Sequence, residues 1–139
     1  MPVPIRLNVV EEDLSARFPV TTTVAASPAL AAETIIATLN IPNFGDTAVV
    51  SGIQLTGWAA YTVGTSGTAV TLRIRQTNVL GTVVSTTGAL SKTAANLYVD
   101  DVNGTDATPG VATYVLTMQV TAGAAASTVS ALSFSAIMV

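Results

Sequence analysis

The sequence of 139 residues contains no cysteine and no histidine. Without cysteine there is no disulfide, no thiolate ligand for a metal and no thiol nucleophile. Without histidine there is no Ser-His-Asp or Cys-His arrangement, and the commonest general base is missing. The acidic residues at 11–13 and at 100–101 are adjacent in sequence and expected on solvated loops, unlike the two carboxylates that a glycosidase holds across a cleft. We therefore expect neither an enzyme nor a bound cofactor.

The sequence also contains few charged residues. Only 9% of the residues are charged, against about 25% in a typical globular domain, while half are hydrophobic. A surface with so little charge tends to associate. This composition predicts a homo-oligomer whose remaining surface is covered by Ser and Thr. The net charge of −3 and the lack of a Lys or Arg run predict no nucleic-acid partner and no anionic membrane surface as partner.

An uninterrupted apolar segment is also missing. Residues 107–139 carry no charge and are long enough to span a bilayer. However, they include Pro109, Gly110 and Gly123, alternate with a period of two, and have no flanking Lys or Arg. We interpret them as β-strands with no membrane partner. The N-terminus lacks the basic and apolar regions of a secretory signal.

What the sequence does contain is strict alternation. Within residues 69–75, apolar and polar residues alternate without interruption from Val70 to Arg75. Because successive side chains of a strand point to opposite faces, this predicts a half-buried strand. Its apolar face comprises Val70, Leu72 and Ile74, and its polar face comprises Thr71, Arg73 and Arg75.

Similar patterns predict strands across the rest of the chain. The expected ranges are 34–41, 49–63, 79–84, 97–99, 111–121 and 127–139. Seven to nine strands with no long helical run indicate an all-β, single-domain antiparallel β-sandwich over residues 32–139. The Gly-rich segment 64–67 predicts a hairpin between 49–63 and 69–75, and residues 100–110 are expected to form a long turn-rich loop.

Residues 1–31 differ from the remainder and are interpreted as an extended N-terminal arm. The prolines near its start favour extended backbone, and Pro19 and Pro28 interrupt any helix. The arm is expected either to add an edge strand to the sandwich or to reach a neighbouring subunit.

Four residues are candidate interface positions. In a chain with five basic residues, Arg73 and Arg75 on one strand face are expected to meet carboxylates of a partner, in which case their removal would weaken assembly more than folding. The alternative is that they are solvated charges that deter aggregation. Trp58, with Tyr61 three residues on, is expected to anchor a core or an interface, and the alternative is a sugar-stacking platform.

Residues 100–106 carry three aspartates, Asp100, Asp101 and Asp106, with Asn103 between them. The spacing departs from the EF-hand pattern, which also requires a closing Glu. We therefore interpret this segment as a turn stabilised by side chains and expect no metal site.

Four segments together resemble small phage structural proteins of the head-decoration and minor-capsid kind. They are residues 68–75, 79–84, 112–121 and 127–136. The resemblance implies a jelly roll, often trimeric, on the outer surface of the capsid in a virion. It also implies a major capsid protein as partner and an arm that clamps onto the shell. The alternative function is the receptor- or glycan-binding tip of a phage fibre, or a cell-surface sandwich module.

Overall fold

The computed structural model describes residues 17–22, 32–41, 52–64, 66, 68–94, 96–107, 113–121 and 128–138. Nine strands form in these ranges. They are β1 (Arg17–Thr22), β2 (Thr34–Asn40), β3 (Ile53–Thr62), β4 (Thr68–Gln76), β5 (Val83–Thr86), β6 (Leu90–Lys92), β7 (Tyr98–Asp106), β8 (Thr113–Thr121) and β9 (Thr128–Met138). No helix in this part of the chain has the length and apolar character needed to cross a membrane.

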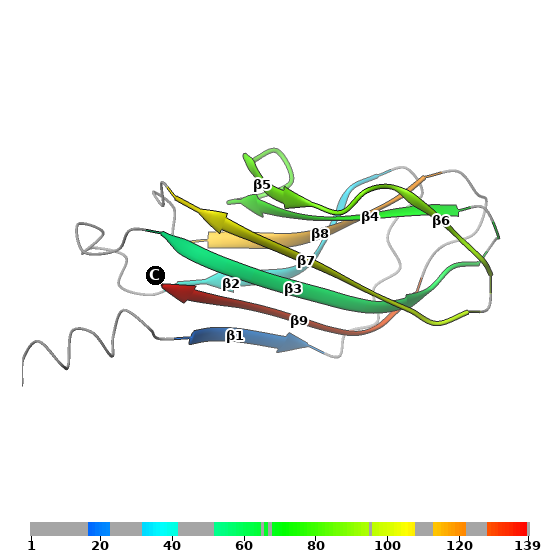
Figure 1. Ribbon diagram of the computed structural model, residues 1–139, viewed down its shortest axis with the longest axis horizontal. Helices are drawn as coiled ribbons and strands as arrows, with labels where there is room; N and C mark the ends of the chain where they lie inside the picture. Colours follow the sequence, from blue (N-terminus) through cyan, green and yellow to red (C-terminus); the bar gives the residue numbers. More distant parts are fainter. Residues whose placement is uncertain are drawn as a thin grey trace, which may run out of the picture.

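The strands form two antiparallel sheets packed face to face (Figure 1). Sheet A has the order β1-β9-β3-β7, and sheet B has the order β2-β8-β4-β5, with β6 also pairing with β4. Each sheet therefore combines strands from distant parts of the chain, as in a jelly roll. The architecture is a jelly-roll-like β-sandwich, which confirms the predicted fold class.

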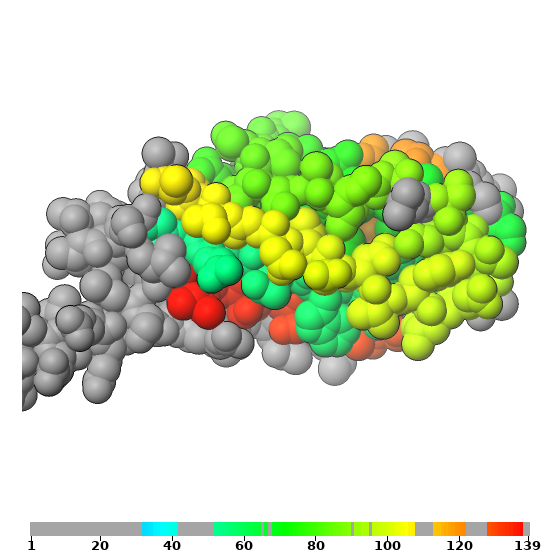
Figure 2. Space-filling view, in the orientation of Figure 1, coloured from blue at the N-terminus to red at the C-terminus, as the bar shows by residue number. Residues whose placement is uncertain are grey.

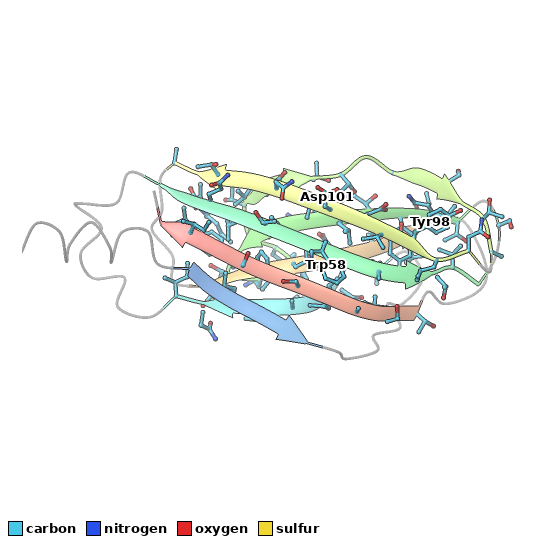
Figure 3. All side chains as sticks on the ribbon, turned by 60° about the horizontal axis from the view of Figure 1, so that its bottom comes forward. Trp58, Tyr98 and Asp101 are labelled. Atoms are coloured by element: carbon cyan, nitrogen blue, oxygen red, sulfur yellow. The ribbon has the colours of Figure 1, made fainter. Side chains whose placement is uncertain are left out.

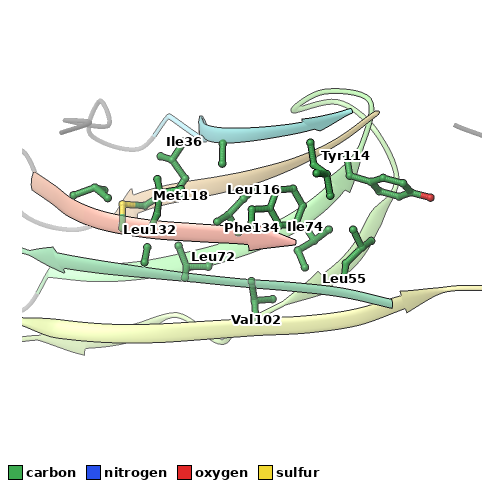
Figure 4. Close-up of a cluster of buried hydrophobic side chains, with 14 of the residues drawn as sticks. Ile36, Leu55, Leu72, Ile74, Val102, Tyr114, Leu116, Met118, Leu132 and Phe134 are labelled. Atoms are coloured by element: carbon green, nitrogen blue, oxygen red, sulfur yellow. The ribbon is translucent and has the colours of Figure 1, made fainter. Parts of the chain in front are cut away.

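The core lies between the two sheets and follows the alternation in the sequence (Figure 4). Leu72 of β4 lies opposite Met118 of β8, and Ile74 lies opposite Leu116. All four side chains are fully buried. Burying such a side chain stabilises the fold by about 1.5–3 kcal/mol, so the two central strands of sheet B carry a large share of the packing energy.

Strand β9 lies in the interior of sheet A, between β1 and β3. The apolar residues on both faces of residues 127–139 predict either a central strand or a strand at a subunit contact, and the position of β9 agrees with the first of these. Strand β1 pairs with it from Arg17 opposite Ile137 to Thr22 opposite Leu132. Part of the predicted N-terminal arm thus forms an edge strand of the sandwich. The acidic run at 11–13 also predicts a short helical turn through residues 14–18; the last two of these residues instead begin β1, and residues 11–16 lie outside the described ranges.

The predicted hairpin between β3 and β4 is wrong. Strand β3 pairs with β7 and β9 in sheet A, whereas β4 belongs to sheet B. The short Gly-rich connection after Thr62 therefore crosses from one sheet to the other. A turn-forming composition does not reveal the crossing, because it fits a sharp bend within one sheet or between two.

The predicted loop at 100–110 is also wrong over most of its length. Residues 98–106 form β7, which pairs with β3 from Tyr61 opposite Tyr98 to Ile53 opposite Asp106. Asp, Asn and Gly are rare in strands, yet here exposed residues alternate with more buried ones such as Val102. Pairing with a buried central strand outweighs the unfavourable propensities.

Three further details of the strands differ from what the sequence predicts. Residues 77–82 form a turn, so the strand expected at 79–84 is β5 at 83–86. Strand β6 lies within residues 85–95, a stretch of small and polar residues for which the sequence predicts no strand. Uninterrupted alternation over 34–41 predicts Ile35 on the same buried face as Ala37, Leu39 and Ile41. Instead, a bulge between Ile35 and Ala37 turns Ile36 into the core and leaves Ile35 exposed.

Candidate interaction surfaces

The outer face of sheet B carries an ion-pair cluster centred on Glu33, the residue that precedes β2. Nε of Arg75 donates to Oε1 of Glu33 at 2.9 Å, and Nη2 of Arg75 donates to Oε2 at the same distance. This two-pronged geometry is the strongest that an Arg–carboxylate pair forms. The side chains of Arg75 and Glu33 are 18% and 14% exposed, so solvent screens the pair incompletely.

Arg73 and Thr117 complete the cluster. Nη1 of Arg73 lies 3.4 Å from Oε1 of Glu33 and donates to Oε1 of Gln119 at 2.7 Å. Oγ1 of Thr117, which is fully buried on β8, donates to the same Glu33 oxygen at 2.6 Å. We call these five residues the Glu33 cluster.

The Glu33 cluster controls the charge of its central carboxylate. Partial burial of Glu33 would raise its pKa, but the hydrogen bonds from Arg75 and Thr117 and the charges of Arg75 and Arg73 act in the opposite direction. The net effect holds the pKa of Glu33 below its usual value. The carboxylate is therefore ionised wherever the protein is folded near neutral pH.

The two arginines predicted to face a partner thus have a carboxylate within their own chain. Both project from the outer face of β4, as the alternation predicted, and neither is fully exposed. Their contact with another subunit stays a prediction. The sequence interpretation missed Glu33, and the available signal was its position as the one acidic residue at the start of an expected strand in a chain with few charges.

Arg75 also holds the turn between β4 and β5. Its Nη1 donates to the carbonyl oxygen of Gly81 at 2.9 Å. Within the turn, the amide of Gly81 donates to the carbonyl of Asn78 at 3.0 Å, and the Asn78 side chain accepts from the amide of Leu80 at 2.8 Å. Thr77 adopts a positive φ of 68°, which β-branched residues rarely do.

This tightly bonded turn presents an apolar side chain to solvent. Leu80 is 91% exposed, more than any other large hydrophobic residue in the described ranges. Val83, at the start of β5, is 41% exposed. The sequence interpretation placed both residues in a strand and missed the exposed tip, because the turn is set by Asn78 and Gly81 and not by an alternation pattern.

A second charged cluster joins β3, β6 and β7. The hydroxyl of Tyr61 donates to Oδ2 of Asp100 at 2.5 Å, and Nζ of Lys92 lies 3.1 Å from the same oxygen. The Lys92 ammonium also lies 4.8 Å from the centre of the Tyr98 ring, which stacks on Tyr61 at 6.0 Å. Burial and then the Asp100 carboxylate raise the pKa of the Tyr61 hydroxyl.

Tyr61 is fully buried, so it belongs to the core and does not share a surface with Trp58. The sequence-based idea of a joint Trp58 and Tyr61 platform is therefore not realised within this chain. An interface role for Tyr61 stays a prediction, because burial within one subunit does not address contacts in an assembly.

The C-terminal end of β7 is also held by hydrogen bonds to an aspartate. The Tyr114 hydroxyl and Nε2 of Gln76 both donate to Oδ2 of the buried Asp106, at 2.9 and 2.6 Å. Burial and then Asp106 raise the pKa of Tyr114. Between these ends, Asp100 and Asp101 lie on opposite faces of the strand. In the described ranges, no group of three or more potential ligands is arranged to hold a metal ion.

Among the side chains that the structure describes, the outer face of sheet A carries less charge than that of sheet B. Trp58 lies in the middle of β3, opposite Asp101 of β7 and Ser133 of β9. Figure 3 shows Trp58 and Asp101 on their neighbouring strands, and Figure 2 shows β7, β3 and β9 side by side on this face of the molecule. We call the outward residues of β3, β7 and β9 the sheet A face. It comprises Gln54, Thr56, Trp58, Val99, Asp101, Asn103, Thr105, Ser133, Ser135 and Ile137.

The fold and these clusters define a jelly-roll-like sandwich in which most of the charged side chains that the structure describes make contacts within the chain. No model of a known protein family matches the sequence. No curated protein matches it.

Solved structures of infectious bursal disease virus share the architecture. The VP2 subviral particle has a TM-score of 0.62 and 14% identity over 88% of this chain and 32% of that chain. The T13 viral particle has a TM-score of 0.65 and 12% identity, over 91% of this chain and 32% of that chain. The Gt strain has a TM-score of 0.64 and 11% identity, over 89% of this chain and 33% of that chain. This chain spans about one third of the length of those chains. At such identities the likeness establishes the fold.

Proposed function

We propose that this protein is a virion structural protein, a capsid decoration or minor capsid protein that stabilises a phage head shell through contacts among several subunits. The observation that carries the proposal is the match of nearly the whole sandwich to structures of a viral particle, at TM-scores of 0.62 to 0.65. The resemblance of four sequence segments to phage decoration proteins supports the same role.

The distribution of charge supports a role in assembly. Glu33 and Asp100 pair with cations of the same chain, and Asp106 is buried against Tyr114. Little charge then lies on the described surface, whereas several large apolar side chains are exposed there. Contacts of this composition resemble the core of an interface between subunits, which is poor in charge. The exposed apolar residues are Ile35, Leu80, Val83, Leu97 and Val99.

We further propose a homotrimer that binds a major capsid protein on the outer surface of the shell. The mechanism is mechanical, since many weakly polar contacts across several subunits together resist expansion of the shell. Leu80 is the favoured contact point, because its turn is already rigid and ordering it costs little on binding. Arg75 supports that turn through Gly81 and so contributes to assembly indirectly.

The test is co-purification with assembled particles from the source that encodes the chain, using wild type and two charge-introducing variants. We expect Leu80→Asp to lower particle occupancy strongly, because it places a charge in an apolar contact. Thr128→Asp introduces the same charge at an exposed position of β9 and serves as the matched control. A wild-type chain that never accompanies particles would refute the proposed function, whereas equal occupancy of both variants would refute the role of Leu80 alone.

A further inference from the structure

The centre of the sheet A face combines one aromatic ring with hydrogen-bonding groups on both neighbouring strands. Trp58 lies opposite Asp101 and Ser133, and the adjacent pair on β3 and β7 is Thr56 with Asn103. Side chains directly opposite each other on an antiparallel pair have Cβ atoms about 4.5–5.5 Å apart. A single small ligand can therefore reach all of these groups.

Trp58 is partly exposed, and no acceptor among the described residues bonds its indole N–H. Buried tryptophans usually find such a partner. The ring therefore offers an apolar surface together with a donor that no described residue uses. Figure 3 shows Trp58 on β3 and Asp101 on the neighbouring β7.

Asp101 and Asn103 form a prepared hydrogen-bonding pair beside the ring. Nδ2 of Asn103 donates to Oδ2 of Asp101 at 3.1 Å, and both residues are exposed. No cation in the described part of the chain pairs with Asp101, in contrast to Glu33 and Asp100. The second carboxylate oxygen and the amide oxygen are thus available to accept hydrogen bonds from a ligand.

These features match the chemistry of a neutral sugar. One face of a pyranose presents C–H groups that pack on an aromatic ring, while its hydroxyls donate to carboxylate and amide oxygens. Asp101 disfavours an anionic sugar, and the cations whose side chains the structure describes, Arg73, Arg75 and Lys92, are engaged with carboxylates away from this face. Val99 beside Asp101 is 63% exposed and offers an apolar contact for a ring substituent.

We propose that the sheet A face binds a neutral saccharide, with Trp58 stacking on the sugar ring and Asp101 and Asn103 receiving its hydroxyls. This site goes beyond the proposed structural role. It would let a protein on a particle surface adhere to uncharged glycans while the opposite sheet and the Leu80 turn contact other subunits.

Trp58 is the only tryptophan, so tryptophan fluorescence, excited at a wavelength that the three tyrosines do not absorb, reports on this face alone. The probes are tri-N-acetylglucosamine and lactose as neutral sugars and 3′-sialyllactose as the anionic comparison. We expect a saturable change in fluorescence with at least one neutral probe and a weaker response to the anionic one. The absence of a saturable response to either neutral probe would overturn the proposal.

Calorimetric titration of the responding sugar then assigns the residues. Asp101→Ala and Asn103→Ala are exposed substitutions and should each lower affinity about tenfold, the loss expected for a hydrogen bond to or beside a charged group. Thr38→Ala, exposed on sheet B, is the matched control and should leave affinity unchanged. Equal affinity of Asp101→Ala and wild type would contradict the assignment. A fluorescence change that follows protein concentration without sugar would identify the face as a subunit contact instead.

Discussion

Arg75 and Glu33 are joined by two parallel hydrogen bonds of 2.9 Å although 42 positions separate them in sequence. Strand β8 lies between β4 and β2, so the pair bridges over it and covers Thr117. The contact fastens the start of β2, which follows the N-terminal arm, to the central strand of the sheet. The two arginines therefore stabilise the fold, whatever they do in an assembly.

Replacing Glu33 should make the free energy of unfolding less sensitive to acidic pH. Because the folded pKa of Glu33 lies below its usual value of 4.5, its contribution is present above that value and is lost as pH falls through the folded pKa. We expect Glu33→Gln to cost about 2–3 kcal/mol at neutral pH, since two arginines lose their carboxylate. Denaturant unfolding from neutral to acidic pH should show a flatter curve for the variant below about pH 4.5. Parallel curves would contradict the role of the cluster.

Arg75 should matter more for folding than Arg73. Arg75 makes two hydrogen bonds to Glu33 and a third to Gly81, whereas Arg73 lies 3.4 Å from Glu33 and bonds Gln119. We expect Arg75→Ala to lower the free energy of unfolding by about 2 kcal/mol, and Arg75→Lys to recover less than half, because an ammonium lacks the planar fork. Arg73→Ala should cost about 1 kcal/mol. With these contacts, we expect both variants to weaken folding as well, and not mainly assembly as the sequence alone suggested. Unfolding curves that Arg75→Ala leaves unchanged would restore the original expectation.

The β4–β5 turn should tolerate no side chain at Gly81. A Cβ there would lie 1.6 Å from the carbonyl oxygen of Gln76, so the turn must rearrange. A Cβ at Gly88 would meet nothing within 4 Å, which makes Gly88→Ala the control. We expect Gly81→Ala to cost at least about 2 kcal/mol and Gly88→Ala to be neutral or slightly stabilising. Thermal unfolding of both variants checks this, and equal midpoints would contradict the described turn.

Two tyrosines should link stability to alkaline pH. The folded pKa values of Tyr61 and Tyr114 are raised above the usual 10.0 by burial and by Asp100 and Asp106, respectively. Their contribution is therefore complete below pH 10 and is lost as pH rises toward the folded values. Tyr61→Phe should cost about 1–2 kcal/mol at neutral pH and flatten the decline above pH 10. The same steep decline in wild type and variant would rule out this linkage.

Alternation was a good guide to the fold where one strand face is fully apolar. Strands β4 and β8 were predicted in this way because Leu72 and Met118 share a core with their neighbours. Only the start of β7 was predicted, as a strand at 97–99; the remainder was missed because its aspartates and Asn103 are typical of a loop, and its pairing with β3 is a long-range property. The passage of the chain from sheet A to sheet B after Thr62 was missed for the same reason, since no local sequence pattern indicates to which sheet a strand belongs.

The candidate surfaces were only partly visible in the sequence. The outward direction of Arg73, Arg75 and Trp58 followed from alternation. The residues beside them could not be predicted in this way. Sheet pairing between distant segments brings Glu33 to the two arginines and places Asp101 opposite Trp58. Leu80 looked like a strand residue until the turn set by Gly81 exposed it.

The central claim is that this chain works as part of an assembled particle. The most direct measurement is density-gradient sedimentation of particles from the source that encodes it, with quantification of the chain in each fraction. The account predicts that the chain travels with the particles at a fixed ratio to the major capsid protein, and that the purified chain sediments as a trimer at dilute concentration. A chain that stays at the top of the gradient as a stable monomer would contradict it.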